Sequence, residues 1–219
     1  MRKSVHHATV FPVRRRPRLR AGGLRPAKPV PVKVHPIEKY DFPEGKSYFF
    51  DTNIWLYIYG PIGWPDQRSD AYSKALKEIR NSEGTIYINC MIISEFINTF
   101  ARIEFKQQTE FTRFKEFRNS LPFRPIAQDI AYNVRKILKS TLACDPEMEV
   151  IDLPEVMDMF AQGKYDFNDL IFAQICRAKN MVFVTHDKDF SELGVEILTA
   201  NERLVDVGRE GNEGKEGRE

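Results

Sequence analysis

The chain has 219 residues, of which 42% are hydrophobic, so one globular domain of ordinary size with short tails is expected. No run reaches the roughly 18 apolar residues of a membrane span, and the basic amino terminus lacks the apolar stretch of a secretion signal. These features predict a cytoplasmic protein that is not associated with a membrane. Three distant cysteines without CxxC spacing predict neither a disulfide framework nor a zinc site.

The net charge of +2 conceals an asymmetry along the chain. Residues 1–35 hold ten of the 33 Lys and Arg residues and no acid, which leaves 23 bases against 31 acids, about −8, in the remainder. We expect residues 1–45, which are rich in Pro and Arg, to be a disordered basic arm or a non-native start. No folded element is predicted before Ile37. The folded domain is placed at residues 46–205, and residues 206–219 are expected to be a disordered tail.

Between these tails, segments typical of strands alternate with segments typical of helices. Strands are predicted at 47–50, 84–89, 149–153, 181–185 and 195–198. Helices are predicted at 68–80, 90–108, 110–118, 127–141, 155–163 and 168–180. Tyr72 falls on the apolar face of the first of these helices. Strands separated by helices pair in parallel, so the expected fold is a three-layer α/β/α sandwich around a parallel sheet of about five strands.

Four acids stand where this fold would bring them together. Asp51 directly follows the first strand, Glu95 lies about one helical turn beyond the second, Asp169 opens a helix, and Asp187 follows the fourth strand. Ligands of open parallel sheets bind outside the carboxyl ends of the strands. Because four neighbouring carboxylates would repel each other, the cluster indicates a site for a divalent cation.

Each acid also has a purely structural interpretation. Asp51 could cap a helix that starts at Thr52. Asp166 and Asp169 have the spacing of a capping box. A turn suffices to explain Asp189, and His186, a single loop histidine, is interpreted as incidental. On local evidence alone, capping and metal binding both remain open for Asp51.

In this order and spacing, four motifs resemble the PIN domain, and specifically the VapC-like ribonuclease toxins. The motifs are FFDTN (49–53), SEF (94–96), NDLIFAQ (168–174) and VTHDKDF (184–190). The resemblance implies an Mg²⁺-dependent endoribonuclease, with Mn²⁺ as an alternative metal. It implies that the metal ligands and catalytic residues are Asp51, Glu95, Asp169 and Asp187. It also implies that supporting groups which fix these carboxylates are Thr52, Asn53, Asp166 and Thr185. The basic arm and the helical segment 105–144 depart from the usual compact toxin.

The sequence gives weaker signals for the substrate and the partners than for the acids. Basic residues interleave with phenylalanines after residue 100, and Arg102, Lys106 and Arg113 are candidate contacts for RNA phosphates. An ordinary amphipathic helix pair with solvated bases explains the same pattern. The resemblance further implies a small antitoxin partner and a homodimer.

Three other functions are compatible with parts of the same pattern. An inactive PIN-like module that binds RNA, and a PIN nuclease of RNA processing, stay open as alternatives to a toxin. A phosphatase of the haloacid-dehalogenase type is excluded, because that class needs a second Asp where this chain has Asn53.

Overall fold

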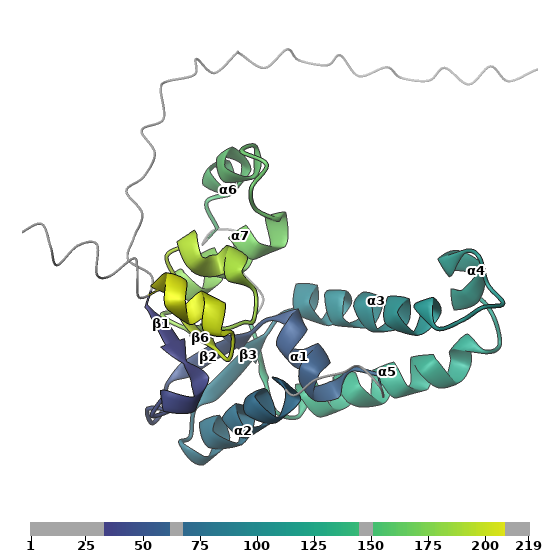
Figure 1. Cartoon of the computed structure of the whole chain (residues 1–219), viewed down its shortest axis with the longest axis horizontal. Helices are drawn as coiled ribbons and strands as arrows, with labels where there is room; N and C mark the ends of the chain where they lie inside the picture. Colours follow the sequence, from purple (N-terminus) through teal and green to yellow (C-terminus); the bar gives the residue numbers. More distant parts are fainter. Residues whose placement is uncertain (1–32, 62–67, 145–150, 209–219) are drawn as a thin grey trace, which may run out of the picture.

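The computed structural model describes residues 33–61, 68–144 and 151–208. They form an α/β fold around a six-stranded sheet in which every pairing is parallel, with the order β1-β6-β5-β2-β3-β4 (Figure 1). The strands are β1 (Val34–Pro36), β2 (Ser47–Phe50), β3 (Thr85–Ile88), β4 (Leu142–Ala143), β5 (Val182–Val184) and β6 (Glu196–Thr199). The predicted α/β/α fold with a parallel sheet is therefore confirmed, with one strand more than expected.

Helices cover the sheet and extend beyond it. They are α1 (Thr52–Tyr59), α2 (Arg68–Asn81), α3 (Cys90–Lys106), α4 (Phe114–Arg118), α5 (Phe123–Leu138), α6 (Leu153–Phe160) and α7 (Phe167–Ala178). Two short 3-10 helices, η1 (Ile37–Lys39) and η2 (Lys188–Glu192), and a helical turn over 202–208 complete the described elements. In Figure 1, α6 and α7 lie above the sheet and α2 lies below it. None of the helices in the described ranges is long and apolar enough to cross a membrane.

The two edges of the sheet correct the sequence analysis. β1 pairs with β6 although no folded element was predicted before Ile37, and Pro36 is tolerated there because β1 is an edge strand. The domain therefore begins before residue 46, whereas residues 1–32 and 209–219 lie outside the described residues. Residues 206–208, assigned to the disordered tail, belong to the last helical turn.

The predicted strand 149–153 is wrong in its described part. Residues 149–150 lie outside the described residues, and Leu153 is the first residue of α6. Asp152 accepts a hydrogen bond from the Glu155 amide, with Pro154 in the first turn, which is a helix-start signal stronger than the local β preference. The outer strand beside β3 is instead the two-residue β4.

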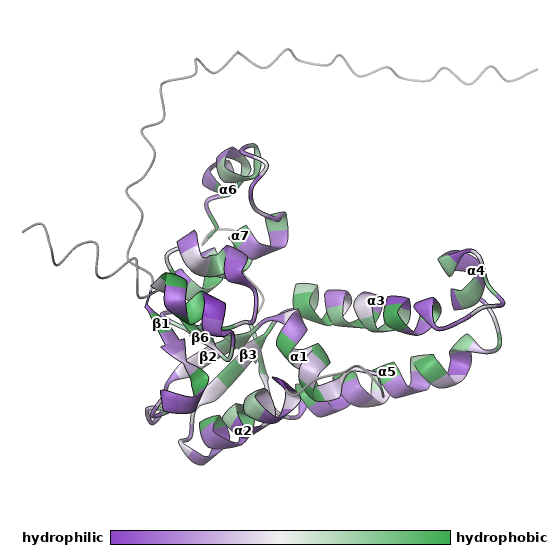
Figure 2. Cartoon of the chain, viewed as in Figure 1, coloured by the Kyte–Doolittle hydropathy of each residue, from purple (hydrophilic) through white to green (hydrophobic). Residues whose placement is uncertain are grey.

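The centre of the sheet is aromatic. Tyr48, Phe49 and Phe50 of β2 are fully buried, and the Phe49 ring stacks on Phe183 of β5. Figure 2 shows hydrophobic strands inside the molecule and helices on which hydrophobic and hydrophilic residues alternate. A continuous apolar strand is expected where helices cover both faces of a parallel sheet. This packing fixes the point at which β2 ends, immediately before Asp51.

A second region, here called the helical arm, comprises residues 90–138 and projects away from the sheet (Figure 1). Its first helix, α3, has 17 residues and is about 25 Å long. At the tip, the buried ring of Phe117 packs against the rings of Phe105, Phe111 and Phe123. Beyond residue 104, the arm falls within the helical segment 105–144, which departs from the usual compact toxin.

Candidate active site

Asp51 links two strands and a helix at the carboxyl edge of the sheet. Its backbone amide donates to the Val184 carbonyl, and its extended backbone makes it the N-cap of α1. The side chain is only 8% exposed, and its Oδ1 accepts from the Thr52 amide at 2.6 Å. Its Oδ2 accepts from Asn53 Nδ2 at 2.6 Å and from Thr185 Oγ1 at 2.7 Å. Asp51 is therefore a cap, but two side-chain donors also hold its carboxylate in place.

Glu95 and Asp187 are tied to the same network. Thr52 Oγ1 donates to Glu95 Oε2 at 3.1 Å, which explains a half-buried acid within the apolar stretch of α3. The Asp187 amide donates to Thr185 Oγ1 at 3.0 Å. The Asp187 carboxylate caps η2 by accepting from the Asp189 amide. The two threonines thus connect three of the four predicted acids.

Asp169 lies in the first turn of α7, half-buried, and Asp166 stands at the N-cap of the same helix. The Asp166 side chain makes no capping hydrogen bond, so the capping box suggested by the sequence is not formed. The exposed Asp166 instead adds negative charge beside Asp169. A cap alone does not account for this pair of acids.

The four acids influence each other electrostatically. Burial raises the pKa of Asp51 to about 7 despite the hydrogen bond from Thr185, and the charges of Glu95 and Asp187 raise it further. The pKa of Asp169 is likewise raised to about 7, first by burial and then by the surrounding carboxylates, which are Asp51, Asp166, Asp187 and Glu95. Every charged neighbour in these two sets is an acid. The sheet edge that carries Asp51, Glu95, Asp169 and Asp187, here called the acidic edge, is therefore short of positive charge.

The fit to a metal ion follows from the donor chemistry. Within the ranges that the structure describes, no group of three or more Asp, Glu, His or Cys side chains is drawn together tightly enough to hold a metal ion. The acids share one edge without forming a closed cage. Mg²⁺ keeps several waters and usually takes only one or two carboxylates directly, so an open, all-oxygen, negatively charged site fits a hydrated hard cation.

The family model of the PIN domain matches residues 48–196, a range that includes all four acids. The chain belongs to the PIN domain family. This confirms the family resemblance predicted from the motifs. The PIN domain is also similar to VapBC2 from Rickettsia felis, solved with a DNA fragment from its promoter, at 16% identity and a TM-score of 0.47, covering 70% of this chain and 98% of that one. A second similar structure is PAE2754 from Pyrobaculum aerophilum, at 16% identity and a TM-score of 0.45, covering 75% and 97%. No curated protein matches the sequence.

The candidate RNA contacts of this PIN domain lie on the helical arm. Arg102 is exposed on α3, and its guanidinium stands 4.7 Å from the centre of the Phe114 ring. Lys106 is in the last turn of α3, and exposed Arg113 forms an ion pair with Glu116 at 3.5 Å. Because Arg102 is seven residues beyond Glu95, it lies about 10 Å farther along the same helix. One helix thus carries both an acid of the edge and candidate phosphate contacts.

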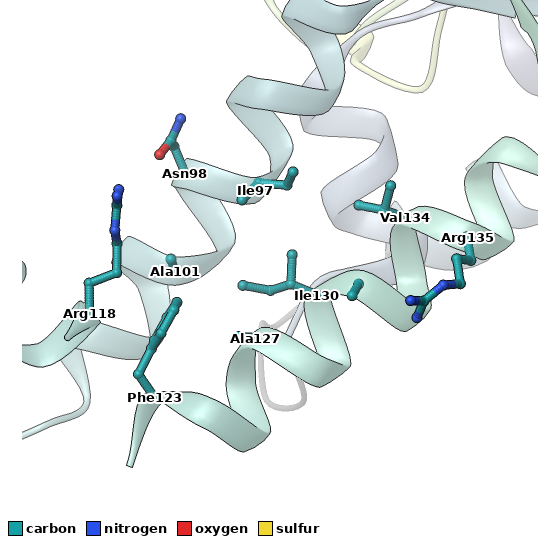
Figure 3. A pocket seen from close by; sticks show the side chains of 10 residues that line it. Ile97, Asn98, Ala101, Arg118, Phe123, Ala127, Ile130, Val134 and Arg135 are labelled. Atoms are coloured by element: carbon teal, nitrogen blue, oxygen red, sulfur yellow. The ribbon is translucent and has the colours of Figure 1, made fainter. Parts of the chain in front are cut away.

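A groove of about 520 Å³ separates α3 from α5 in the arm (Figure 3). The side chains of Ile97, Phe123 and Ile130 point into the space between the two helices, and Arg118 and Arg135 are among the other residues that line it. None of the four acids lines this groove. It is an apolar surface distinct from the acidic edge.

Two residues beside the edge were not among the predicted site residues. Tyr72 was expected only as part of an apolar helix face, yet its hydroxyl lies 2.9 Å from His186 Nδ1 and accepts from the Ala200 amide at 3.0 Å. His186 was interpreted as incidental. Helical periodicity does not predict this contact. A periodicity pattern counts tyrosine as an apolar residue and gives no information on what its hydroxyl contacts.

Proposed function

We propose that this PIN domain is an endoribonuclease that depends on Mg²⁺, with Mn²⁺ as an alternative, held by Asp51, Glu95, Asp169 and Asp187. The observation that carries the proposal is the set of four acids at one sheet edge, two of them with pKa values raised by burial and by the other acids. Membership of the PIN family supports a nuclease. Such an acid cluster weakens the fold unless a cation offsets the repulsion, which favours catalysis over an inactive RNA-binding module.

In this proposal, the residues around the acids orient the carboxylates. Asn53 and Thr185 hold Oδ2 of Asp51, and Thr52 directs Glu95 toward the same edge. Hydrogen-bonded partners of this kind fix the orientation of carboxylate ligands. Asp166 adds negative charge at the start of α7. When bound, a divalent cation supplies charge neutralisation and a more acidic water for attack on a phosphodiester.

The raised pKa values couple cation binding to pH. Asp51 and Asp169 have pKa values of about 7, so near neutral pH each is partly protonated in the metal-free protein. A carboxylate must lose its proton to bind a metal ion, and binding therefore tightens as the pH rises.

The biological role is the finer part of the proposal. We propose a cytoplasmic toxin of a toxin–antitoxin pair, which forms a homodimer and is inhibited by a small antitoxin protein. The support is the resemblance of the motifs to VapC-like toxins. A PIN nuclease of RNA processing shares the same acids and is the alternative. Co-purification with the product of an adjacent small gene, together with growth arrest on expression that this product relieves, distinguishes a toxin from a processing enzyme.

The test of the enzymatic proposal is cleavage of a structured RNA pool by the full chain with Mg²⁺, with Mn²⁺ and with EDTA. Cleavage is expected with either metal, and is expected to stop with EDTA and in the Asp51→Asn variant. Asp41→Asn is the matched control, because Asp41 is exposed and precedes β2 rather than following it. RNA binding without metal-dependent cleavage would overturn the proposal in favour of the inactive module.

A further inference from the structure

Tyr72 places one hydroxyl at the meeting point of three segments. The side chain is fully buried, and its ring stacks on Tyr57 of α1 with centroids 5.8 Å apart. The hydroxyl accepts from the Ala200 amide at 3.0 Å, contacts His186 Nδ1 at 2.9 Å and lies 3.5 Å from the Thr185 carbonyl. It thereby joins α2 to the loops that follow β5 and β6.

His186 is held at its backbone as well as at its ring. Asn201 Nδ2 donates to its carbonyl at 2.8 Å, and its amide donates to Asn53 Oδ1 at 3.4 Å. The imidazole meets the Tyr57 ring edge-on, with centroids 5.6 Å apart. Its two chain neighbours are Thr185, which donates to Asp51, and the acid Asp187. Whatever fixes His186 therefore fixes a segment that contributes two groups to the acidic edge.

We propose that Tyr72 is a positioning residue for the acidic edge, whose hydroxyl holds His186 and thereby the segment Thr185–Asp187. The catalytic consequence of this inference rests on the proposed nuclease function, whereas its structural part does not. Tyr72 does not touch the four acids through any of these contacts. It acts on them through His186 and the backbone.

The hydroxyl, rather than the ring, carries the inference. Phenylalanine would fill the same buried volume, and a buried hydroxyl destabilises a core unless hydrogen bonds compensate it. Burial raises the pKa of Tyr72 to about 12, so the phenol keeps its proton at neutral pH. The Ala200 amide occupies one lone pair, and the nearest acceptor for the O–H is Nδ1 of His186.

The test compares Tyr72→Phe with Tyr48→Phe. Both remove the hydroxyl of a fully buried tyrosine, but Tyr48 is the second residue of β2 and lies about 10 Å along the chain from Asp51. For Tyr72→Phe we expect a kcat lower by about 10- to 100-fold with little change in KM, and weaker Mn²⁺ binding to the RNA-free protein. We also expect faster hydrogen exchange at the amides of His186 and Asp187. Tyr48→Phe should leave all of these unchanged.

His186 variants keep the test decisive if Tyr72→Phe does not fold. His186→Ala should reproduce the losses, and His186→Asn, which keeps a polar atom near the position of Nδ1, should restore most of the activity. Unchanged exchange at Asp187 together with wild-type Mn²⁺ affinity in Tyr72→Phe or His186→Ala would overturn the inference. If the wild type neither cuts RNA nor binds Mn²⁺, the proposed function fails. In that case the exchange at Asp187 alone decides the positioning role.

Discussion

The acidic edge concentrates negative charge, whereas the helical arm is dominated by apolar contacts. The edge gathers four buried or half-buried acids, of which three stand at a strand end or a helix start and Glu95 stands in the second turn of α3. The arm contains a groove of about 520 Å³, and residues such as Ile97, Ala101 and Ile130 line it. Apolar hollows are common binding sites for small molecules, so this groove taken alone would point to the arm as the functional site. The clustered negative charge, the burial of the acids and the hydrogen-bond donors that link them indicate the acidic edge instead.

This difference separates residues that stabilise the fold from residues that the proposed function assigns to a metal ion. The arm buries apolar side chains, which favours folding directly. The edge concentrates like charges, which opposes folding unless the proposed cation neutralises them. Substitutions in the arm should therefore lower stability, whereas substitutions of the acids should lower activity.

The largest effect is expected for removal of an acid from the edge. Asp169→Asn should lower RNA cleavage by more than about 100-fold, beyond the effect typical of partners that only orient metal ligands. The free energy of unfolding of the metal-free protein should stay the same or rise, because repulsion among the acids is relieved. Cleavage rates and urea denaturation in EDTA check both parts. Asp158→Asn, at an exposed position of α6, is the control, and equal activity of the two variants would remove Asp169 from the site.

The arm should show the reverse signature. Phe117→Ala removes the buried ring at the centre of the tip cluster and should lower the free energy of unfolding by about 3–5 kcal/mol. Mn²⁺ binding at the edge should persist under conditions in which the variant remains folded. Urea denaturation and titration with Mn²⁺ measure the two quantities. Loss of Mn²⁺ binding in the folded variant would show that the two regions are not independent.

The pH dependence of stability isolates the edge. Asp51 has a folded pKa of about 7 against an ordinary value of 3.8, so the native state binds its proton more tightly than the unfolded state does. The contribution of Asp51 to the stability of the metal-free protein should be largest below about pH 4, fall by roughly 1 to 4 kcal/mol as the pH rises to about 7, and then level off. Urea denaturation in EDTA between pH 4 and pH 8 measures this slope.

Two additions sharpen the pH experiment. Asp51→Asn should flatten the slope, because it removes one of the two titrating carboxyls. Mn²⁺ at about 100 times its dissociation constant should restore about 2.7 kcal/mol at pH 8. A wild-type slope that is already flat would contradict the raised pKa values and with them the repulsive edge.

The sequence indicated the edge well because its signals are local. Asp51 directly follows an apolar run and Asp187 follows another after two residues, and such runs mark buried strands of a parallel sheet. Glu95 was noticeable as a charge within an apolar stretch. Asp166 does occupy the N-cap position that the spacing suggests, but its side chain makes no capping hydrogen bond, because residue spacing does not determine which way a side chain turns.

The remaining misses depend on tertiary contacts. β1 and β4 have three and two residues, too few for any periodicity, and exist because a neighbouring strand pairs with them. The groove arises from how α3 packs beside α5. An amphipathic pattern predicts the apolar face of each helix, but it does not predict which other helix packs against that face. The hydroxyl of Tyr72 was missed for the same reason, since its partners are more than 100 residues away.

The smallest expected effect tests whether RNA joins the two regions. If the bound strand runs from the acids along α3, Arg102→Gln should raise KM a few-fold, leave kcat unchanged and reduce the slope of log affinity against log salt by about 0.7, the value for one phosphate contact on a single strand. Arg80→Gln, at the exposed end of α2, removes the same charge away from this path and is the control. Salt titrations of RNA binding compare the two variants in the Asp51→Asn background, where the RNA stays intact. Equal slopes would mean that Arg102 serves the packing of its guanidinium against Phe114, and that the substrate leaves the edge by another route.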